Sequence, residues 1–200
     1  LSILIDDCVA TARDYYDGGP RYNTNYIQGV GVGTITDALA AINFHVFDNK
    51  SLSMRDLLAA LKADFKGHET LRQTLLQRTP KYGNDDNYAD EIMRSVFETY
   101  FSAVDGRPNT KGGKYRINML PTTVHVYFGS VMGATPDGRK AGLPLSEGIS
   151  PVQGADRQGP TAVLKSAAKM DHGRTGGTLL NMKFAPALLE GDDGLDNLTH

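Results

Sequence analysis

The sequence predicts an α/β fold that is mainly helical over residues 1–105 and made of strands and loops over residues 106–200. Apolar side chains recur at helical spacing through most of the first part. In the second part, Thr122–Phe128 combines β-branched and aromatic residues, and Gly177–Phe184 is a short apolar run. Both are therefore expected to be buried strands. A tract rich in glycine and proline, residues 134–181, occupies most of the chain between them.

Local signals mark the expected helices. An apolar stripe over Leu4–Ala12 predicts a first helix, which must end before the pair of glycines at 18 and 19. Ser53 is a suitable N-cap with Asp56 at the third helical position, and Pro160 suits the first turn of a helix over 161–170. The remaining helices are expected over about 36–46, 54–65, 69–78 and 88–104.

The tract over residues 134–181 is expected to follow one fixed path. Glycine permits backbone with positive φ, whereas proline fixes φ and removes a donor, and the two alternate along this tract. Ordering each residue costs about 1–2 kcal/mol, so the loop must be held against a large scaffold. The alternating residues are Pro136, Gly138, Gly142, Pro144, Gly148, Pro151, Gly154, Gly159 and Pro160.

Composition is that of part of a soluble globular enzyme. The formal net charge of −2 is too balanced to indicate nucleic acid or an acidic membrane surface as partner. No apolar run approaches the roughly 18 residues that predict a membrane span. The single cysteine, Cys8, excludes an internal disulfide and favours a reducing compartment, the cytoplasm. The abrupt start at Leu1 and stop at His200 predict that residues 1–200 are one segment of a longer protein.

Two motifs resemble ligand sites but favour a structural interpretation. Gly29–Gly33 approximates a dinucleotide fingerprint, yet Thr34 occupies the place of the third glycine, so a tight helix entry is expected. The Asn84-Asp85-Asp86 turn offers oxygen ligands for a cation but lacks the ligand spacing of a calcium loop. Asp86 is instead expected to cap the following helix.

Other reactive side chains lack partners in the sequence. The five histidines are scattered and Cys8 has no second cysteine, so no zinc or iron–sulfur site is expected, and Cys8 is interpreted as core packing. Ser146 and Ser150 have no evident His–Asp partners for hydrolysis. Arg139 and Lys140 are consistent either with an anion site or with a solvated or ion-paired turn.

Several long, ordered and non-periodic motifs resemble the glycyl radical enzymes, the family that includes pyruvate formate-lyase. The resemblance runs from residue 18 onward and is strongest to the dehydratase branch. The motifs that carry it are RYNTNYIQGVGVGTITDALAAI, PKYGNDDNYADEI, GRPNTKGG, MLPTTVHVYFGSVMGATPDGR, PLSEGISP, GPTAVLKS and RTGGTLLN.

This resemblance implies both a fold and a reaction. The fold is a barrel of two half-sheets wrapped by helices, in which a cysteine loop and a glycine loop meet. The reaction begins when a glycyl radical oxidises the cysteine to a thiyl radical, which abstracts hydrogen from the substrate. Radical dehydration of a small hydroxylated substrate such as trans-4-hydroxy-L-proline is expected. The implied partners are the rest of the barrel, a second copy in a homodimer, and an iron–sulfur activating enzyme that uses S-adenosylmethionine.

The sequence departs from the family pattern at its two defining motifs. It contains no Gly-Cys-x-Glu segment and no Arg-Val-x-Gly-Tyr segment. Both are expected to lie outside the chain, the first before Leu1 and the second after His200. No catalytic residue, cofactor or metal ligand is therefore expected within residues 1–200, and this chain alone is expected to be inactive.

The one expected site is the pair Thr122 and Thr123, at the start of the expected strand. Resemblance to the dehydratases implies that a threonine of this pair contacts substrate, and Pro121 marks the irregular start of the strand. Strand alternation does not decide between them, and β-propensity alone also explains both; Thr122 is the first choice.

Three alternative functions remain open from the sequence. The parent protein could be a pyruvate formate-lyase-like enzyme or another radical lyase that breaks C–C or C–N bonds. The chain could instead be a non-catalytic structural or interaction module. The least favoured alternative is a phosphate-binding α/β domain that uses the Gly29–Gly33 loop.

Overall fold

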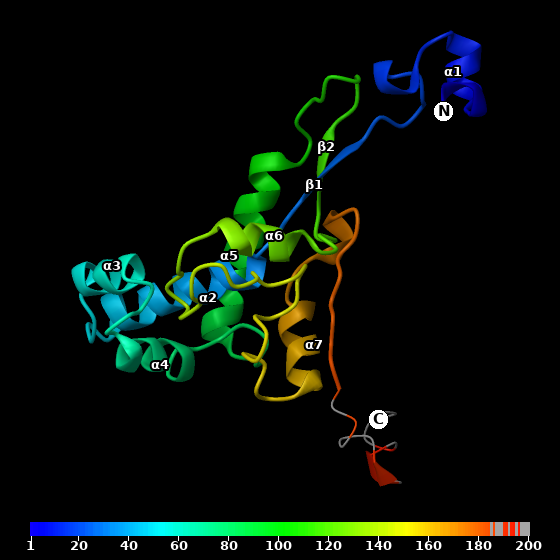
Figure 1. Ribbon diagram of the computed structural model, residues 1–200. Coiled ribbons are helices and arrows are strands. Elements are labelled where there is room, and N and C mark those ends of the chain that lie inside the picture. Colours follow the sequence, from blue (N-terminus) through cyan, green and yellow to red (C-terminus); the bar gives the residue numbers. More distant parts are fainter. Residues whose placement is uncertain (185, 187–189, 192, 195, 197–200) are drawn as a thin grey trace.

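The computed structural model describes residues 1–184, 186, 190, 191, 193, 194 and 196, and shows a helical body from which a small parallel sheet extends (Figure 1). Short 3₁₀ turns occupy Ser2–Leu4, Tyr15–Asp17 and His172–Arg174. The main elements are α1 (Asp6–Thr11), β1 (Asn25–Gln28), α2 (Val32–Ile42), a π-helical turn (Asn43–Asp48), α3 (Met54–Lys62), α4 (Glu69–Gln77), α5 (Asn87–Val104), β2 (Tyr115–Asn118), α6 (Val124–Val131) and α7 (Pro160–Ala168).

Most of the expected helices are confirmed, because their caps are local. The Ser53 hydroxyl accepts the Asp56 N–H at 3.1 Å at the start of α3, and the Asp86 carboxylate accepts the Tyr88 N–H at 2.9 Å at the start of α5. Pro160 is the first residue of α7. The first helix is shorter than expected, and α2 begins four residues earlier than the sequence indicated.

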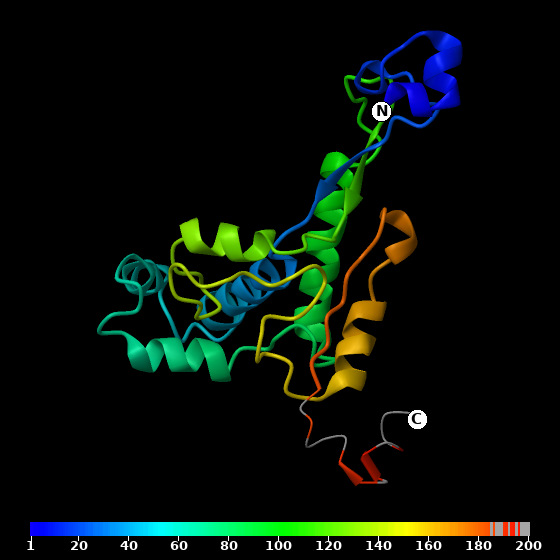
Figure 2. The same cartoon turned by 45° about the vertical axis from the view of Figure 1, so that its right-hand side comes forward.

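The sheet consists of β1 and β2, which pair in parallel with Asn25 opposite Tyr115 and Gln28 opposite Asn118. Helices α2 to α5 make the crossover between these strands, as a parallel pair requires. The two strands extend from the body toward the end of the molecule that carries α1, and two views show the same arrangement (Figures 1 and 2). The sheet is thus open in the described part of the chain.

The prediction of a strand over Gly177–Phe184 is wrong as a regular element. Only Thr178 makes a bridge, which is parallel and pairs it with Met119. The Met119 N–H donates to the Gly177 carbonyl at 2.9 Å, and the Leu179 N–H donates to the Met119 carbonyl at 3.0 Å. On its other side, this segment contacts the glycine- and proline-rich loop, in which the Ile149 N–H donates to the Leu179 carbonyl. Because the second neighbour is a loop and not a strand, the pairing does not propagate.

The prediction of a strand over Thr122–Phe128 is also wrong, because the chain turns at Thr122 and continues as α6. The ladder stops at Leu120, whose N–H donates to the Gln28 side chain at 2.8 Å. Gly129 then lets the helix lie directly against the Leu143 carbonyl, an approach that leaves no room for a Cβ. Tertiary packing has therefore overridden the β-propensity of this segment.

Two buried clusters form the core, with α5 along one and α3 and α4 enclosing the other. The first cluster contains Val32, Tyr82, Ala89, Met93, Phe97, Ile117, Met119, Ile149, Ala167 and Met170. The second contains Ala41, Leu57, Ala60, Phe65 and Leu75.

None of the helices in the part of the chain that the structure describes is long and apolar enough to cross a membrane.

One face of α6 is apolar and uncovered. Val124, Tyr127, Phe128 and Val131 follow the i, i+3, i+4, i+7 pattern and are 38–69 % exposed. A stripe with this spacing is ordinarily the buried face of a helix. The described residues leave this stripe exposed to solvent.

The 200-residue chain produced alone is expected to self-associate, because the α6 stripe is uncovered and the outer edge of β1 has no strand partner among the described residues. Sedimentation velocity should show larger species as concentration rises, and the thermal midpoint should depend on concentration. Val131→Lys should reduce this association. Gln73→Lys, which adds the same charge at an exposed position of α4, should not. A monomer with a midpoint independent of concentration would contradict this expectation.

Candidate functional site

The predicted threonine pair lies in a strained turn between the end of β2 and α6. Thr122 has φ of +50°, a left-handed conformation that is a genuine outlier for a β-branched residue. Thr123 is the N-cap of α6. Both side chains are exposed, and neither hydroxyl bonds to another residue in the described part of the chain. The turn thus presents two uncommitted hydroxyls at the start of a helix.

The loop over residues 142–145 holds α6 in place from both ends. The Gly142 N–H donates to the Met132 carbonyl at 3.1 Å, and the Leu145 N–H donates to the His125 carbonyl at 3.2 Å. The direct packing of Gly129 on this loop lies between these two bonds. The position of the threonine turn therefore depends on a loop that follows it in the sequence.

Arg139 fixes the conformation of that loop, which resolves the alternatives left open for it. Its buried guanidinium donates to the carbonyls of Gly133 and Leu143 and to the Thr135 hydroxyl. Burial lowers the pKa of the Arg139 guanidinium, and the nearby Asp137 opposes that shift. With three of its five N–H donors bonded to the chain, Arg139 is a structural clamp.

The structural interpretation of the Gly29–Gly33 motif is confirmed. Gly31 is the N-cap residue of α2 with φ of +75°, and a Cβ on Gly33 would lie 2.8 Å from the Ser150 carbonyl oxygen, so the loop that leads from β1 into α2 is a tight helix entry. Ser146 accepts the Thr34 N–H at 2.9 Å, and Ser150 accepts the Asn181 N–H at 2.9 Å. Both serines therefore position backbone.

The acidic turn and Cys8 are also structural. Asp86 caps α5, and Asp85 lies 3.1 Å from the Lys169 ammonium. Cys8 is buried, and burial, reinforced by Asp14 and Asp7, raises the pKa of its thiol. No group of three or more potential metal ligands occurs among the residues that the structure describes.

The histidines agree with their expected structural roles in two cases. His45 lies 3.0 Å from the Thr79 hydroxyl, and His172 lies 2.8 Å from the Ala167 carbonyl. His125 is buried in the first turn of α6, and its Nδ1 has no partner in the described part of the chain. His200 lies outside the described residues.

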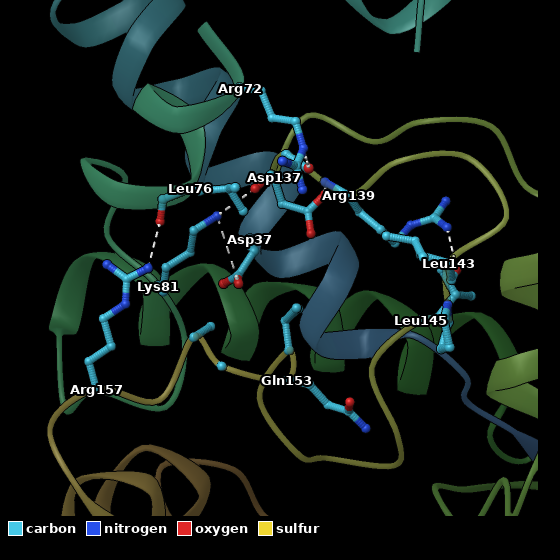
Figure 3. Close-up of a pocket in the computed structure, with 15 residues that line it drawn as sticks. Asp37, Arg72, Leu76, Lys81, Asp137, Arg139, Leu143, Leu145, Gln153 and Arg157 are labelled. Atoms are coloured by element: carbon cyan, nitrogen blue, oxygen red, sulfur yellow. Dashed lines mark hydrogen bonds and ion pairs between the residues drawn. The ribbon is translucent and has the colours of Figure 1, made fainter. Parts of the chain in front are cut away.

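A buried ionic cluster joins α2 to the glycine-rich loop, and the sequence did not reveal it (Figure 3). The Asp37 carboxylate accepts the Tyr82 N–H at 2.9 Å, and its other oxygen lies 4.0 Å from the Lys81 ammonium. Lys81 donates to the Asp137 carbonyl at 3.1 Å. Asp37 and Lys81 are 1 % and 7 % exposed.

The cluster has perturbed electrostatics because burial disfavours charge. Burial raises the pKa of the Asp37 carboxyl to about 7, against the opposing effect of the Lys81 ammonium. Burial also lowers the pKa of Lys81, and Asp37 opposes this shift. One signal could have revealed Asp37: it is a charged residue on the face of α2 that also carries Ala40 and Ala41, both fully buried.

Comparisons with known families match most of the chain. Residues 1–129 match the family described as pyruvate formate lyase-like, and residues 145–200 match the family described as glycine radical. The second match covers much of the glycine- and proline-rich tract. The resemblance read from the motifs is confirmed.

Individual relatives agree with this assignment. Trans-4-hydroxy-L-proline dehydratase of Clostridioides difficile is 57 % identical over 100 % of this chain and 25 % of the relative. Isethionate sulfite-lyase of Bilophila wadsworthia is 43 % identical over 88 % of this chain and 21 % of the relative. A crystal structure of hydroxyproline dehydratase from Clostridioides difficile with trans-4-hydroxy-L-proline bound has a TM-score of 0.92 and 58 % identity, covering 98 % of this chain and 25 % of that one. The chain thus spans about a quarter of the length of these relatives.

The buried Asp37 predicts a pH dependence of stability. Its pKa in the folded state lies above the value of about 3.9 in an unfolded chain, so the folded state holds an extra proton between these values. The resulting stabilisation is present below about pH 4 and is lost as pH rises to about 7. Relative to Asp37→Asn, the wild type should lose about 2 kcal/mol between pH 5 and 7, measured as a fall of a few degrees in thermal midpoint.

Asp156→Asn is the control for this measurement, because it removes an exposed carboxylate from the neighbouring loop. The difference in thermal midpoint between Asp156→Asn and the wild type should stay constant from about pH 5 to 7. If the difference in thermal midpoint between Asp37→Asn and the wild type also stayed constant with pH, the folded protein would not hold the extra proton on Asp37.

Proposed function

Because this chain belongs to the pyruvate formate lyase-like family of glycyl radical enzymes, we propose that it is a segment of a radical dehydratase. The proposed reaction is cleavage of a C–O bond in a small hydroxylated substrate such as trans-4-hydroxy-L-proline. The observation that carries the proposal is the 57 % identity to a hydroxyproline dehydratase over the whole chain, turn-rich loop included. A backbone match with a TM-score of 0.92 supports it.

The proposed contribution of this chain is the wall and one polar contact of the substrate pocket. A glycyl radical, installed by an activating enzyme that uses S-adenosylmethionine and an iron–sulfur cluster, would supply hydrogen abstraction in the complete enzyme. The cysteine and glycine motifs of that chemistry are absent from the sequence of residues 1–200. In this proposal the chain therefore binds and encloses the substrate, and it excludes water from a reactive intermediate.

Thr122 is the proposed substrate contact, with Thr123 as the second choice. Strained backbone of this kind costs about 1–3 kcal/mol and is concentrated at functional sites. A hydroxyl can donate to or accept from a polar substrate, and the start of a helix such as α6 favours a negatively charged group nearby. A substrate carboxylate or hydroxyl fits this position.

A radical lyase is the second candidate. Its support is the 43 % identity to isethionate sulfite-lyase, which is spread over 88 % of the chain. The same scaffold therefore occurs in proteins that are named for different bond cleavages.

Turnover by the complete protein separates these two candidates. After anaerobic activation, we expect consumption of trans-4-hydroxy-L-proline with loss of water, followed by mass spectrometry, and no sulfite release from isethionate. The 200-residue chain treated identically serves as control and should show neither activity nor an organic-radical EPR signal. Sulfite release without hydroxyproline turnover would favour the lyase, and a radical signal from the short chain would refute its proposed role.

Thr122→Val in the complete protein tests the proposed contact. Valine keeps the β-branched shape, so the strained turn is matched and only the hydroxyl is lost. Loss of a hydrogen bond to a charged substrate group costs about 1.5–3 kcal/mol, which corresponds to about a 10- to 150-fold fall in kcat/KM. Thr99→Val, at an exposed position of α5, is the matched control and should change neither constant. Unchanged KM and kcat in Thr122→Val would exclude this residue.

A further inference from the structure

A cavity of about 320 Å3 lies between α2, the segment that joins α4 to α5, and the glycine-rich loop (Figure 3). This volume is at the lower end of the range of about 300–1,000 Å3 for small-molecule sites, so any ligand must be small. Neither threonine of the turn before α6 lines it. The lining residues are Asp37, Arg72, Leu76, Lys81, Asp137, Gly138, Arg139, Leu143, Pro144, Leu145, Val152, Gln153, Gly154, Ala155 and Arg157.

The cavity carries an excess of positive charge. Four cationic side chains line it against the two carboxylates Asp37 and Asp137. Arg139 gives three of its five N–H donors to the loop. Lys81 and Arg72 keep donors for a ligand: Lys81 has three N–H groups and makes one hydrogen bond within the described residues, to the Asp137 carbonyl. Arg72 uses only its Nε, which donates to the Gly138 carbonyl at 2.9 Å, within the described part of the chain.

The burial of Lys81 is the strongest indication that an anion belongs here. Its side chain is 7 % exposed, yet the nearest carboxylate oxygen, on Asp37, is 4.0 Å away, beyond hydrogen-bond distance. A buried ammonium is stable only when it is paired and fully hydrogen-bonded. An oxyanion in the cavity would accept hydrogen bonds from the remaining N–H groups of Lys81.

Apart from Asp137, Gln153 and Arg157, most of the remaining wall is apolar and selects the rest of the ligand. Leucine, proline, valine and alanine side chains surround the cavity and offer no partner to further polar groups of a ligand. A short hydrocarbon body therefore suits this wall, with a single charged group at the Lys81 end. The apolar lining residues are Leu76, Leu143, Pro144, Leu145, Val152 and Ala155.

We propose that this cavity binds a short-chain carboxylate, with its oxyanion on Lys81 and Arg72 and its hydrocarbon part against the apolar wall. The site is separate from the threonine turn, so the proposal does not depend on the proposed function.

Ligand-observed NMR titration of the complete, non-activated protein tests this proposal, because no turnover occurs without the radical. Butyrate, 1-butanol and n-butylammonium share one carbon chain and differ in charge. Butyrate should bind at least tenfold more tightly than 1-butanol, and n-butylammonium should not bind. Equal binding of butyrate and 1-butanol, or preference for the ammonium, would overturn the proposal.

Variants then place the ligand in this cavity. Lys81→Met keeps the side-chain stem and should weaken butyrate at least tenfold, whereas Asp37→Asn removes an opposing charge and should strengthen it. Ala155→Leu fills the apolar wall without changing any charge, and should abolish binding even if Lys81→Met fails to fold. Thr122→Val is the control for the substrate site and should have no effect. Butyrate binding that survives Ala155→Leu, or that is lost in Thr122→Val, would refute the assignment.

Discussion

Two reciprocal hydrogen bonds between Thr34 and Ser146 fix the relation between the two halves of this chain. The Thr34 N–H donates to the Ser146 hydroxyl at 2.9 Å, and the Ser146 N–H donates to the Thr34 hydroxyl at 2.8 Å. The pattern is that of a capping box, except that the partner lies 112 residues away in the sequence. The residue before α2, Gly31, has no side chain with which to cap, so the distant loop supplies what the helix start lacks.

This contact explains how a turn-rich loop becomes ordered and how it orders its surroundings. Ordering costs about 1–2 kcal/mol for each residue, and the loop recovers this cost through bonds to the helical half. The Tyr82 hydroxyl donates to the Ile149 carbonyl at 2.9 Å, a few residues beyond Ser146. Just before Ser146, Leu145 holds the first turn of α6. The threonine turn is therefore positioned from α2, through the loop, and not from the strand that precedes it.

The parts of the fold that the sequence predicted correctly are those whose causes are local. Ser53 and Asp86 accept N–H groups of their own helices, and Pro160 supplies a helical φ in the first turn of α7, so their positions were sufficient to place three helix starts. The two expected strands failed for a common reason. Whether Thr122–Phe128 extends or coils depends on a loop some fifteen residues later, and Gly177–Phe184 lacks a second strand to pair with.

The same distinction between local and distant causes applies to the candidate site. The resemblance selected the threonine pair from a motif and expected it at the start of a strand, whereas the structure places it in the turn before α6. Asp37 escaped notice because its lysine partner is 44 residues away and separated from it by two helices. Ion pairing between distant segments leaves no periodic signal in a single sequence.

Asp37 and Thr122 both break local rules, and they differ in how their cost is offset. Asp37 is a buried carboxylate, but the Tyr82 N–H and the Lys81 ammonium offset part of its desolvation, so a structural role accounts for some of its presence. Thr122 occupies left-handed backbone, and its hydroxyl forms no bond within the described residues that could repay the strain. Violations without internal compensation are the ones expected at functional sites. By this criterion Thr122 supports the proposed substrate contact, because no hydroxyl hydrogen bond among the described residues offsets its strain.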